Sequence, residues 1–459
     1  LVGSEMCIRD RYLTTSCIIK PDNDIYGYFD QLSRKSKLLY NAALFRIRNI
    51  FTGYDKEHRT ENEKAVFDEV NLLCQKDPSV KVRRVISYYH LEKMLKATDN
   101  SDYRHRGLPT HVAQHVVKQA VADFNNWLAA LKGFKKHPEN YTGKPCMPHY
   151  KKGELTTFET TNQEAVLYSN GYKTELKMPL TKKRISFSNL PNDGILKTVK
   201  VKPFYGMFKL LLIFEVPENN ISCKDMPNIC SIDFGVDNFA TIVCNDGSAA
   251  IYKGNAVLSE CQWFHKQKAK YVSILTTGKE YSRYAPTKTL KKLSYHHSNF
   301  INDQCHKISR NIVNYCISHN AGTLVLGVNK FWKQNSSMGK RSNQNFISMP
   351  ITILRKMITY KAERAGIKVI EQEESYTSKA DIVAQDYIPV YGKDDYNVCF
   401  SGNRIKRGLY RCNNKLIINA DCNGSANIMR KAIPEAWKGI TDFAFLADPT
   451  VYGYKKVNS

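Results

Sequence analysis

The sequence lacks long apolar runs, closely paired cysteines and enough acidic residues to balance its bases. Its most apolar stretch, residues 208–216, has the length of a strand and is far too short to cross a membrane. None of the 13 cysteines stands in C-x-x-C spacing with another, and this odd, scattered set indicates free thiols in a reducing compartment. Asp and Glu total 43 against 68 for Lys and Arg, which leaves a net charge of +25 over 459 residues.

Targeting signals are also missing. No signal peptide is recognisable, and the first residue is Leu. The opening residues, LVGSEMCIRDR, resemble a translated sequencing adapter, so we expect residues 1–11 to be a non-native leader outside the fold. We expect an intracellular protein without a membrane partner, nuclear in a eukaryotic host and cytoplasmic in a prokaryotic one.

The excess positive charge is spread along the whole chain in short clusters, at residues 135–136, 151–152, 182–184, 291–292 and 404–407. A folded protein with this excess most often holds a polyanion, and nucleic acid is the leading candidate. The 27 Tyr and 20 Phe offer side chains for base stacking. A basic surface that meets only water is the weaker alternative.

The length predicts two or three domains, and the pattern changes near residue 228. Before that point we expect a strand over 12–20, helices over 28–51, near 82–95 and from 108 onward, and a basic linker over 133–153. Alternating strands then follow between 157 and 216, with Asn170-Gly171 as a hairpin turn. This order predicts a small antiparallel barrel or sheet that carries a helical insertion.

From residue 228 the pattern alternates between strands and helices. Three short strands run to Tyr252, helical segments cover 260–275 and 289–319, and a fully apolar strand covers 322–327. A helix over 350–365 and a strand over 367–370 follow, which predicts a mixed α/β sheet. The polar segment 378–415 is an insertion, a last helix opens near 419, and the tail after 433 has no evident role.

Three acidic positions follow buried elements of this predicted sheet: Asp233, the pair Glu373-Glu374, and Asp421. A carboxylate at the mouth of a buried strand is costly unless it meets a cation or a donor. Taken singly, Asp233 is also typical of a capped turn and Asp421 of a helix N-cap. Taken together, carboxylates from separate elements of one sheet can hold two Mg²⁺ ions about 4 Å apart.

Several motifs in order carry a resemblance: IDFGVDNFAT, LVLGVNKFWKQ with NQNF after it, ESYTSK, RIKRGLYR and INADCNGSANI. Residues 228–431 resemble the RuvC nuclease half of the TnpB and Fanzor family of transposon-encoded, RNA-guided DNA endonucleases. The N-terminal half is similar to that family only in architecture. The resemblance implies an α+β multidomain protein with an N-terminal β-barrel (wedge), a helical recognition insertion and an RNase H-like RuvC α/β domain.

The implied domain limits follow the family's order. They are a first wedge strand over 12–27, a helical recognition region over 28–135, the wedge barrel over 136–227 and the RuvC domain over 228–377. A small insertion that binds target nucleic acid covers 378–418, the last RuvC motif and helix cover 419–435, and a tail covers 436–459.

The implied function is RNA-guided cleavage of target DNA, with a guide RNA and two Mg²⁺ as cofactors and no required protein partner. Asp233, Glu374 and Asp421 would be the catalytic metal ligands, with Glu373 as the alternative to Glu374. Basic residues would contact nucleic acid, namely Lys151, Lys152, Arg404, Lys406, Arg407 and Arg411.

One departure from the family concerns the second catalytic position. Gly327-Val328-Asn329 stands where the family usually has a glutamate at the end of a strand. Family members with a glutamate relocated farther along are the model for choosing Glu374, because its strand should pair beside residues 324–326. An inactive descendant that holds RNA and DNA as a regulator is one alternative. An unguided RNase H-like nuclease is another.

A second departure concerns zinc. The family often has a four-cysteine zinc site before the last aspartate. Here that part of the chain has only Cys399, Cys412 and Cys422, none in C-x-x-C spacing. Because a structural zinc site takes four ligands, we predict that this protein binds no zinc.

Overall fold

The computed structural model describes residues 12–103, 107–169, 173–187, 190–191, 193–217, 226–278, 284–329, 347–390 and 398–453. The chain divides into two compact units, with one unit ending at Pro217 and the other running from Glu218 to Ser459. The predicted leader, residues 1–11, lies outside the described residues. The finer domain limits drawn from the sequence stay predictions.

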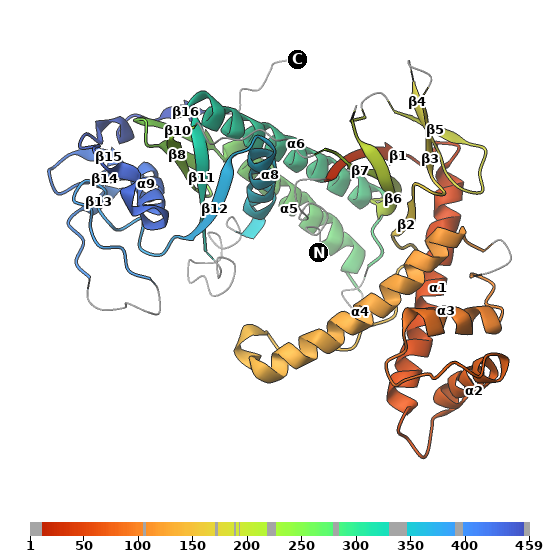
Figure 1. The fold of residues 1–459 in the computed structure, drawn as a ribbon. Helices are drawn as coiled ribbons and strands as arrows, with labels where there is room; N and C mark the ends of the chain where they lie inside the picture. Colours follow the sequence, from red (N-terminus) through yellow and green to blue (C-terminus); the bar gives the residue numbers. More distant parts are fainter. Residues whose placement is uncertain are drawn as a thin grey trace. The chain divides into compact units, whose positions relative to one another are not determined.

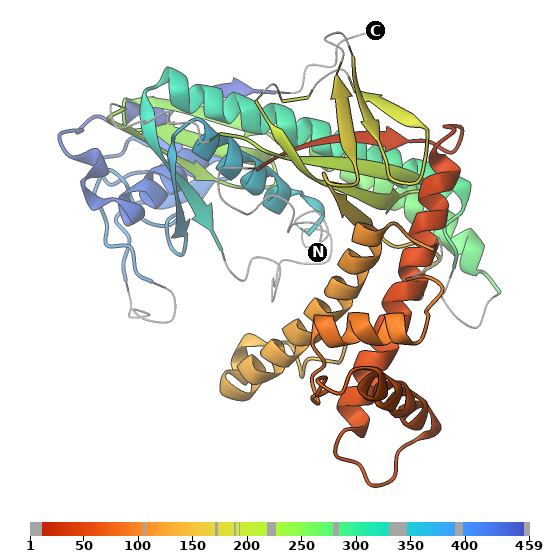
Figure 2. The same cartoon turned by 45° about the vertical axis from the view of Figure 1, so that its right-hand side comes forward.

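The N-terminal unit contains four α-helices among its described residues: α1 (Tyr26–Gly53), α2 (Glu61–Lys76), α3 (Tyr88–Ala97) and α4 (Thr110–Lys136). A short 3-10 turn, η1 (Pro138–Asn140), follows α4. The long helices α1 and α4 pack on each other (Figure 2). The Tyr40 hydroxyl donates to Asp123 at 2.6 Å. The apolar stripes of the two helices have the helical spacing expected from the sequence.

The helix α2 was not expected from the sequence, because residues 55–105 are mostly polar. It is held by a capping box, in which the Thr60 hydroxyl accepts from the Glu63 amide and the Glu63 carboxylate accepts from the Thr60 amide. Val66, Val70 and Leu73 form its narrow buried stripe. Both signals were present in the sequence, but a stripe of three residues is weak.

The described strands of this unit form two antiparallel sheets, in agreement with the barrel or sheet expected from the pattern, and closure into a barrel stays a prediction. Within the described residues, β1 (Tyr12–Ile19), β7 (Met207–Glu215), β6 (Ile195–Phe204) and β2 (Phe158–Thr161) make an open antiparallel sheet in that order. A second sheet contains β3 (Val166–Ser169), β4 (Thr174–Lys177) and β5 (Arg184–Phe187). The single strand expected over 157–168 is broken by a turn, in which the Glu164 amide donates to the Thr161 carbonyl.

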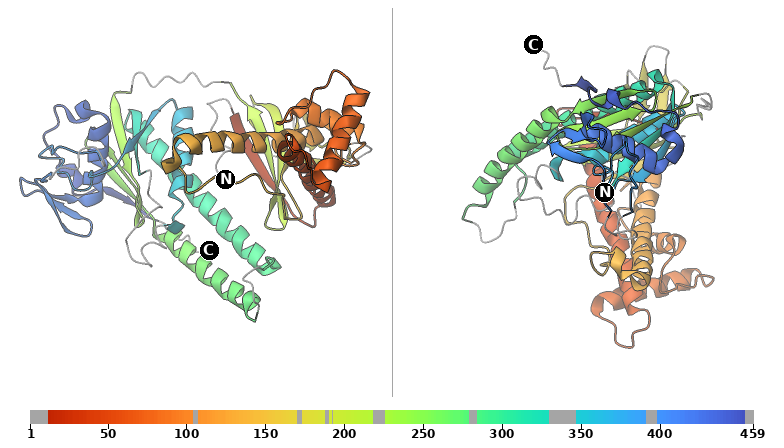
Figure 3. Two further views of the ribbon diagram at one scale, coloured as in Figure 1. Left: turned by 90° about the horizontal axis from the view of Figure 1, so that it is seen from below. Right: turned by 90° about the vertical axis from the view of Figure 1, so that its left-hand side faces the viewer.

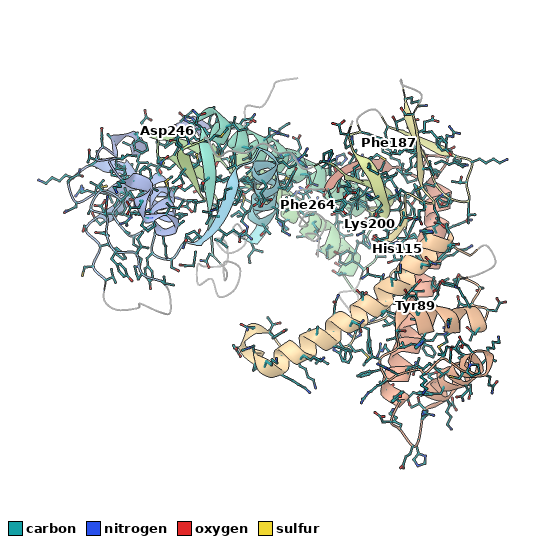
Figure 4. The ribbon with its side chains drawn as sticks, viewed as in Figure 1. Tyr89, His115, Phe187, Lys200, Asp246 and Phe264 are labelled. Atoms are coloured by element: carbon teal, nitrogen blue, oxygen red, sulfur yellow. The ribbon has the colours of Figure 1, made fainter. Side chains whose placement is uncertain are left out.

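Two further predictions for this unit, which concern the first strand and the β3–β4 hairpin, agree with the structure. β1 pairs with β7 along its whole length, so the chain returns to the sheet of its first strand after the helical insertion. β3 and β4 pair as the expected hairpin, although its turn residues, Asn170 and Gly171, lie outside the described residues. The carboxylate of Glu159 on β2 joins His115 of α4 to Lys200 of β6, at 2.9 and 3.8 Å, and thereby ties α4 to the sheet (Figure 4).

The C-terminal unit is built on a six-stranded sheet in the order β12-β11-β8-β9-β10-β16. The strands are β8 (Asn228–Asp233), β9 (Asn238–Cys244), β10 (Ser248–Lys253), β11 (Ala321–Val328), β12 (Lys368–Glu373) and β16 (Thr450–Tyr452). β8, β11 and β12 are parallel to one another, and β9 runs antiparallel between β8 and β10. This mixed α/β sheet agrees with the alternation of strands and helices in the sequence.

Helices cover both faces of this sheet (Figure 1). One face packs on α5 (Asn255–Thr276), α6 (Lys288–Ser318) and α8 (Ile351–Arg364), and α5 lies alongside α6 (Figure 3). The other face packs on α9 (Ala420–Ala432). Neighbouring residues of β10 therefore enter opposite layers, which explains why the strand reads as a continuous apolar run.

The insertion between β12 and α9 folds into a small antiparallel sheet of β13 (Asn403–Lys406), β14 (Leu409–Arg411) and β15 (Ile417–Asn419). Part of the tail after residue 433, for which the sequence suggested no role, contributes to the core through Ala436, Trp437, Phe443 and Leu446. It contains η3 (Pro434–Trp437) and η4 (Ala444–Leu446), and then β16, which pairs with β10. Among the described residues, no helix combines the length and apolar character needed to cross a membrane.

Candidate metal and nucleic-acid site

Three sequence-predicted carboxylates are carried to one region of the C-terminal unit. Asp233 is the last residue of β8, Glu374 directly follows β12, and Asp421 lies in the first turn of α9. β8 and β12 flank β11 in parallel, so their carboxyl ends reach the same edge of the sheet. Edges of this kind are where open α/β sheets usually bind their ligands.

The helix α9 docks closely on β8 and brings Asp421 to that edge. The Ser231 hydroxyl donates to the Ser425 carbonyl at 2.7 Å, and the Ser425 hydroxyl donates to the Ser231 carbonyl at 2.9 Å. A side chain at Gly424 would place its Cβ 3.0 Å from the Asp233 carboxylate, so glycine permits this approach. The N-cap of α9 is Asn419, which leaves the Asp421 carboxylate free of a capping role.

The charges of the other two carboxylates act on Asp233. Burial raises the pKa of Asp233 well above its usual value, and the negative charges of Glu374 and Asp421 raise it further. Burial, followed by the neighbouring charge of Glu373, raises the pKa of Glu374 to about 7. A cluster of carboxyls held together against their own repulsion is typical of a site that takes up cations.

The adjacent glutamates at the end of β12 have different surroundings. Both carboxylate oxygens of Glu373 are used, one by Lys431 at 2.8 Å and the other by the Ser375 amide and hydroxyl. Burial acts to raise the pKa of Glu373, but these donors outweigh it and the pKa is lowered. In contrast, Glu374 Oε2 is buried without a hydrogen-bond partner, one of three such side-chain atoms in the described part of the chain.

Gly327 leaves room for the Glu374 carboxylate. A Cβ at this position of β11 would lie 2.9 Å from Glu374 Oε2 and 2.7 Å from a methyl of Ile428. Any larger side chain at residue 327 would therefore compete with Glu374 for the same space. The strand position that lacks a carboxylate thus lies directly beside a carboxylate supplied by the next strand.

Sequence reasoning missed the residues that hold Asp421. The Asn238 amide of β9 donates to Asp421 Oδ2 at 2.5 Å, and Lys253 of β10 donates to Asn238 Oδ1 at 2.8 Å. Arg404 of β13 lies 3.7 Å from Asp421 Oδ1. The available signal was the polar residue Asn238 at the start of a strand whose other residues are all buried.

The chemistry of these groups fits a hard divalent cation. In the described residues, no three His, Cys, Asp or Glu side chains converge closely enough to hold one ion by themselves. Mg²⁺ is commonly bound by only one or two carboxylates, with waters and substrate phosphates as its other ligands. The unpartnered oxygen of Glu374 and the raised pKa of Asp233 indicate carboxylates whose negative charge is not fully balanced by nearby donors and cations.

The predicted nucleic-acid contacts fall into two groups. Lys151 is committed inside the N-terminal unit, because its amine donates to Thr156 at 3.0 Å and lies 3.7 Å from the centre of the Tyr40 ring. Burial lowers its pKa, so it differs from an exposed phosphate contact. The other five are exposed: Lys152 in the N-terminal unit, and Arg404, Lys406, Arg407 and Arg411 on the β13–β14 hairpin, where Arg407 pairs with Asp237.

The three cysteines near α9 have separate environments. Cys399 is exposed, whereas Cys412 and Cys422 are buried in the apolar layer beneath α9. Burial raises the pKa of Cys412 to about 12, so this thiol behaves as a small apolar side chain. The absence of bound zinc stays a prediction.

Comparisons with known proteins identify relatives of the C-terminal unit. The model of the OrfB_IS605 family, described as a probable transposase, matches residues 222–332. The model of the Cas12f1-like TNB domain matches residues 352–428. These two segments contain Asp233, Glu374 and Asp421.

Two curated proteins are similar over about half of the chain. The TnpB-like protein ORF457 of Acidianus two-tailed virus is 26% identical over 211 residues, which are 45% of this chain and 42% of that protein. The CRISPR-associated endodeoxyribonuclease Cas12f1 of Sulfoacidibacillus thermotolerans is 30% identical over 227 residues, 48% of each chain. The chain thus spans about half the length of the curated relatives that it matches.

A solved structure shares the fold more widely. The Cas12f1 chain of a complex with sgRNA and target DNA superposes with a TM-score of 0.52 at 14% identity, over 88% of this chain and 82% of that one. At this identity the likeness shows the fold alone. The two family models and the two curated relatives support the TnpB and Cas12f1 family for the C-terminal unit.

Proposed function

We propose that this protein is an RNA-guided DNA endonuclease that hydrolyses target DNA in a RuvC-type, Mg²⁺-dependent site. The proposal is supported by the family of the C-terminal unit, by the names of its relatives, and by the net charge of +25. In such proteins, base pairing with a guide RNA chooses the target, and the protein reads backbone shape and a short flanking motif. The RNase H-like assignment is supported by a first strand that ends in Asp233 and leads into a hairpin.

The observation that carries the proposal is the shared site of Asp233, Glu374 and Asp421, in which Glu374 Oε2 has no partner. These residues would hold Mg²⁺, which supplies an activated water and stabilises charge on the phosphate. Each carboxylate has its own support: burial against α9 for Asp233, the space at Gly327 for Glu374, and the Asn238 amide for Asp421. The exposed arginines of the β13–β14 hairpin would contact the nucleic-acid backbone near Asp421.

A second candidate function is an inactive descendant that holds RNA and DNA and acts as a regulator. It is favoured by Gly327, which stands where the family usually has its glutamate. The two candidates share binding and differ in cleavage. An unguided RNase H-like nuclease would cut without any RNA that co-purifies with it.

The test begins with nucleic acid that co-purifies with the full chain. We expect a defined RNA, which sequencing identifies, and Mg²⁺-dependent cleavage of DNA that matches its guide segment. Asp233→Asn, Glu374→Gln and Asp421→Asn should each keep the RNA and lose cleavage. Protein with bound RNA and no cleavage at any Mg²⁺ concentration would support the regulator, and cleavage by RNA-free protein would support the unguided nuclease.

The same assay decides between the two glutamates. If Glu374→Gln cuts at a near wild-type rate while Glu373→Gln does not, Glu373 rather than Glu374 is the second acidic metal ligand. If both variants cut, neither residue is the second acidic ligand, and the relocated-glutamate assignment fails.

A further inference from the structure

The chain ends β12 with two chemically equal glutamates, so something must determine which one turns toward Asp233. Side chains on a strand alternate in direction, and Glu373 and Glu374 therefore face opposite sides. In the structure both oxygens of Glu373 accept hydrogen bonds, from Lys431 and from Ser375, whereas Glu374 Oε2 has no partner.

Lys431 of α9 is a buried cation whose three donors are all used. Its side chain is only 7% exposed. Its amine donates to Glu373 Oε2 at 2.8 Å, to the Ser375 carbonyl at 3.0 Å and to the Pro389 carbonyl at 3.1 Å. An ammonium group has three protons, so this geometry saturates it and leaves no donor for Glu374.

The contacts of Lys431 bracket Glu374 from both sides in the chain. Glu373 before it and Ser375 after it are held by the same amine, and the Ser375 amide donates back to Glu373 Oε1 at 2.7 Å. The next residue, Tyr376, has a left-handed backbone with a φ of 62°, which is unfavourable for a bulky residue. The contacts of Lys431 and Ser375 thus hold a strained turn, and in this turn the Glu374 side chain is directed toward Gly327.

We propose that Lys431 is a positioning residue that selects Glu374, rather than Glu373, as the carboxylate facing Asp233. The inference rests on the proposed function and adds a residue that no motif marks. Because Lys431 lies on the helix that also carries Asp421, docking of α9 delivers one carboxylate and orients another. Without the lysine, Glu373 would keep a partly buried charge without a cation and would turn outward, and Glu374 would leave Asp233.

The test measures binding of Mn²⁺, used alone as a spectroscopic probe, to the purified full chain by electron paramagnetic resonance. Lys431→Met keeps the length and apolar stem of the side chain and removes its donors. We expect it to weaken Mn²⁺ binding about tenfold or more, as removal of supporting residues does at other metal sites. Thermal unfolding of the metal-free protein is measured in parallel.

Lys361→Met is the matched control. Lys361 of α8 is also buried, and its amine donates to the His306 carbonyl at 2.7 Å and to the Ser309 hydroxyl at 2.6 Å, neither of which contacts the three carboxylates. This control should unfold at a lower temperature while its Mn²⁺ affinity stays within about twofold of wild type. Equal Mn²⁺ affinities for wild type and Lys431→Met would overturn the inference and reduce Lys431 to a structural residue.

The double variant Lys431→Met with Glu373→Gln separates position from charge. It leaves no unpaired carboxylate at residue 373, so stability should recover, while Mn²⁺ binding should stay weak because Glu374 remains unanchored. Recovery of both would overturn the inference, since Lys431 would then only neutralise Glu373. Wild-type protein that binds Mn²⁺ no better than Asp233→Asn would instead overturn the proposed function together with the inference.

Discussion

At the scale of single residues, Glu374 makes the stability of the metal-free protein depend on pH. Its pKa is raised from 4.5 to about 7, so the folded state holds the proton more tightly than the unfolded chain. Its favourable contribution is therefore complete below about pH 4.5 and is lost as the pH rises through about 7. Glu374→Gln cannot ionise, and at pH 8 it should be more stable than wild type by about 1 to 3 kcal/mol.

Denaturant unfolding at pH 5 and pH 8 without divalent metal checks this prediction. The advantage of Glu374→Gln should shrink at the lower pH, where the wild-type carboxyl is protonated. Asp303, an exposed acidic residue of α6, provides the control, and Asp303→Asn should show little difference at either pH. A Glu374→Gln variant that is less stable than wild type at pH 8 would contradict the raised pKa.

Asn238 should control the orientation of the Asp421 carboxylate. Its amide donates to Asp421 while its carbonyl accepts from Lys253, so Asn238→Asp keeps the shape and replaces a donor with a negative charge. We expect cleavage to require several-fold more Mg²⁺, as commonly follows the loss of a supporting hydrogen bond at a metal ligand. Asn228→Asp, at the far end of β8, is the control, and an unchanged Mg²⁺ requirement for Asn238→Asp would remove Asn238 from the site.

The sequence could predict the positions of Asp233 and Asp421, because each stands at the end or start of a strongly patterned element. It left Glu373 and Glu374 unresolved for a physical reason. Their difference depends on Lys431, which is distant in sequence and carries no pattern of its own. The role of Asn238 was hidden in the same way, since its partner Asp421 comes from the other end of the domain.

At the scale of elements, the segment after α9 should be essential for stability. Trp437 of η3 is 2% exposed, donates to the Ala426 carbonyl at 3.1 Å and packs edge-on against Phe443. Trp437→Ala should lower the free energy of unfolding of the C-terminal unit by about 3 to 5 kcal/mol. Trp263→Ala on α5, where the side chain is 50% exposed, should change it by about 0.5 kcal/mol or less.

Chemical denaturation of both tryptophan variants tests this role. Equal effects at Trp437 and Trp263 would mean that η3 is not part of the core. The tail was missed in the sequence because it is anchored by scattered aromatic residues rather than by a periodic stripe. The small capped helix α2 was missed for a related reason, since three apolar residues do not stand out from their polar surroundings.

At the scale of the whole molecule, the positive charge should make nucleic-acid affinity strongly dependent on salt. Each phosphate contact adds about 0.7 to 0.9 to the slope of log affinity against log salt concentration. Lys406→Gln should reduce that slope by roughly one, because its side chain is exposed on the β13–β14 hairpin. Lys151→Gln removes the same charge from a buried amine and should leave the slope unchanged.

Binding titrations at four or more salt concentrations, with the co-purified RNA and its matching DNA, measure these slopes. Equal slopes for wild type and Lys406→Gln would remove the hairpin from the interface. The change of pattern that the sequence shows near residue 228 lies close to the boundary at Pro217 between the two compact units. The number of sheets in the N-terminal unit was not predictable, because short alternating strands do not specify their partners.

The late position of α9 in the chain has a consequence for synthesis on the ribosome. β8 and Asp233 emerge first, whereas Asp421, Lys431 and the edge strand β16 are translated later. In a nascent chain, Asp233 therefore stands at the end of an incomplete sheet whose second face is not yet covered by α9. Under the proposed function, a product that stops before α9 would lack Asp421 and would therefore be harmless to the DNA of the cell that makes it.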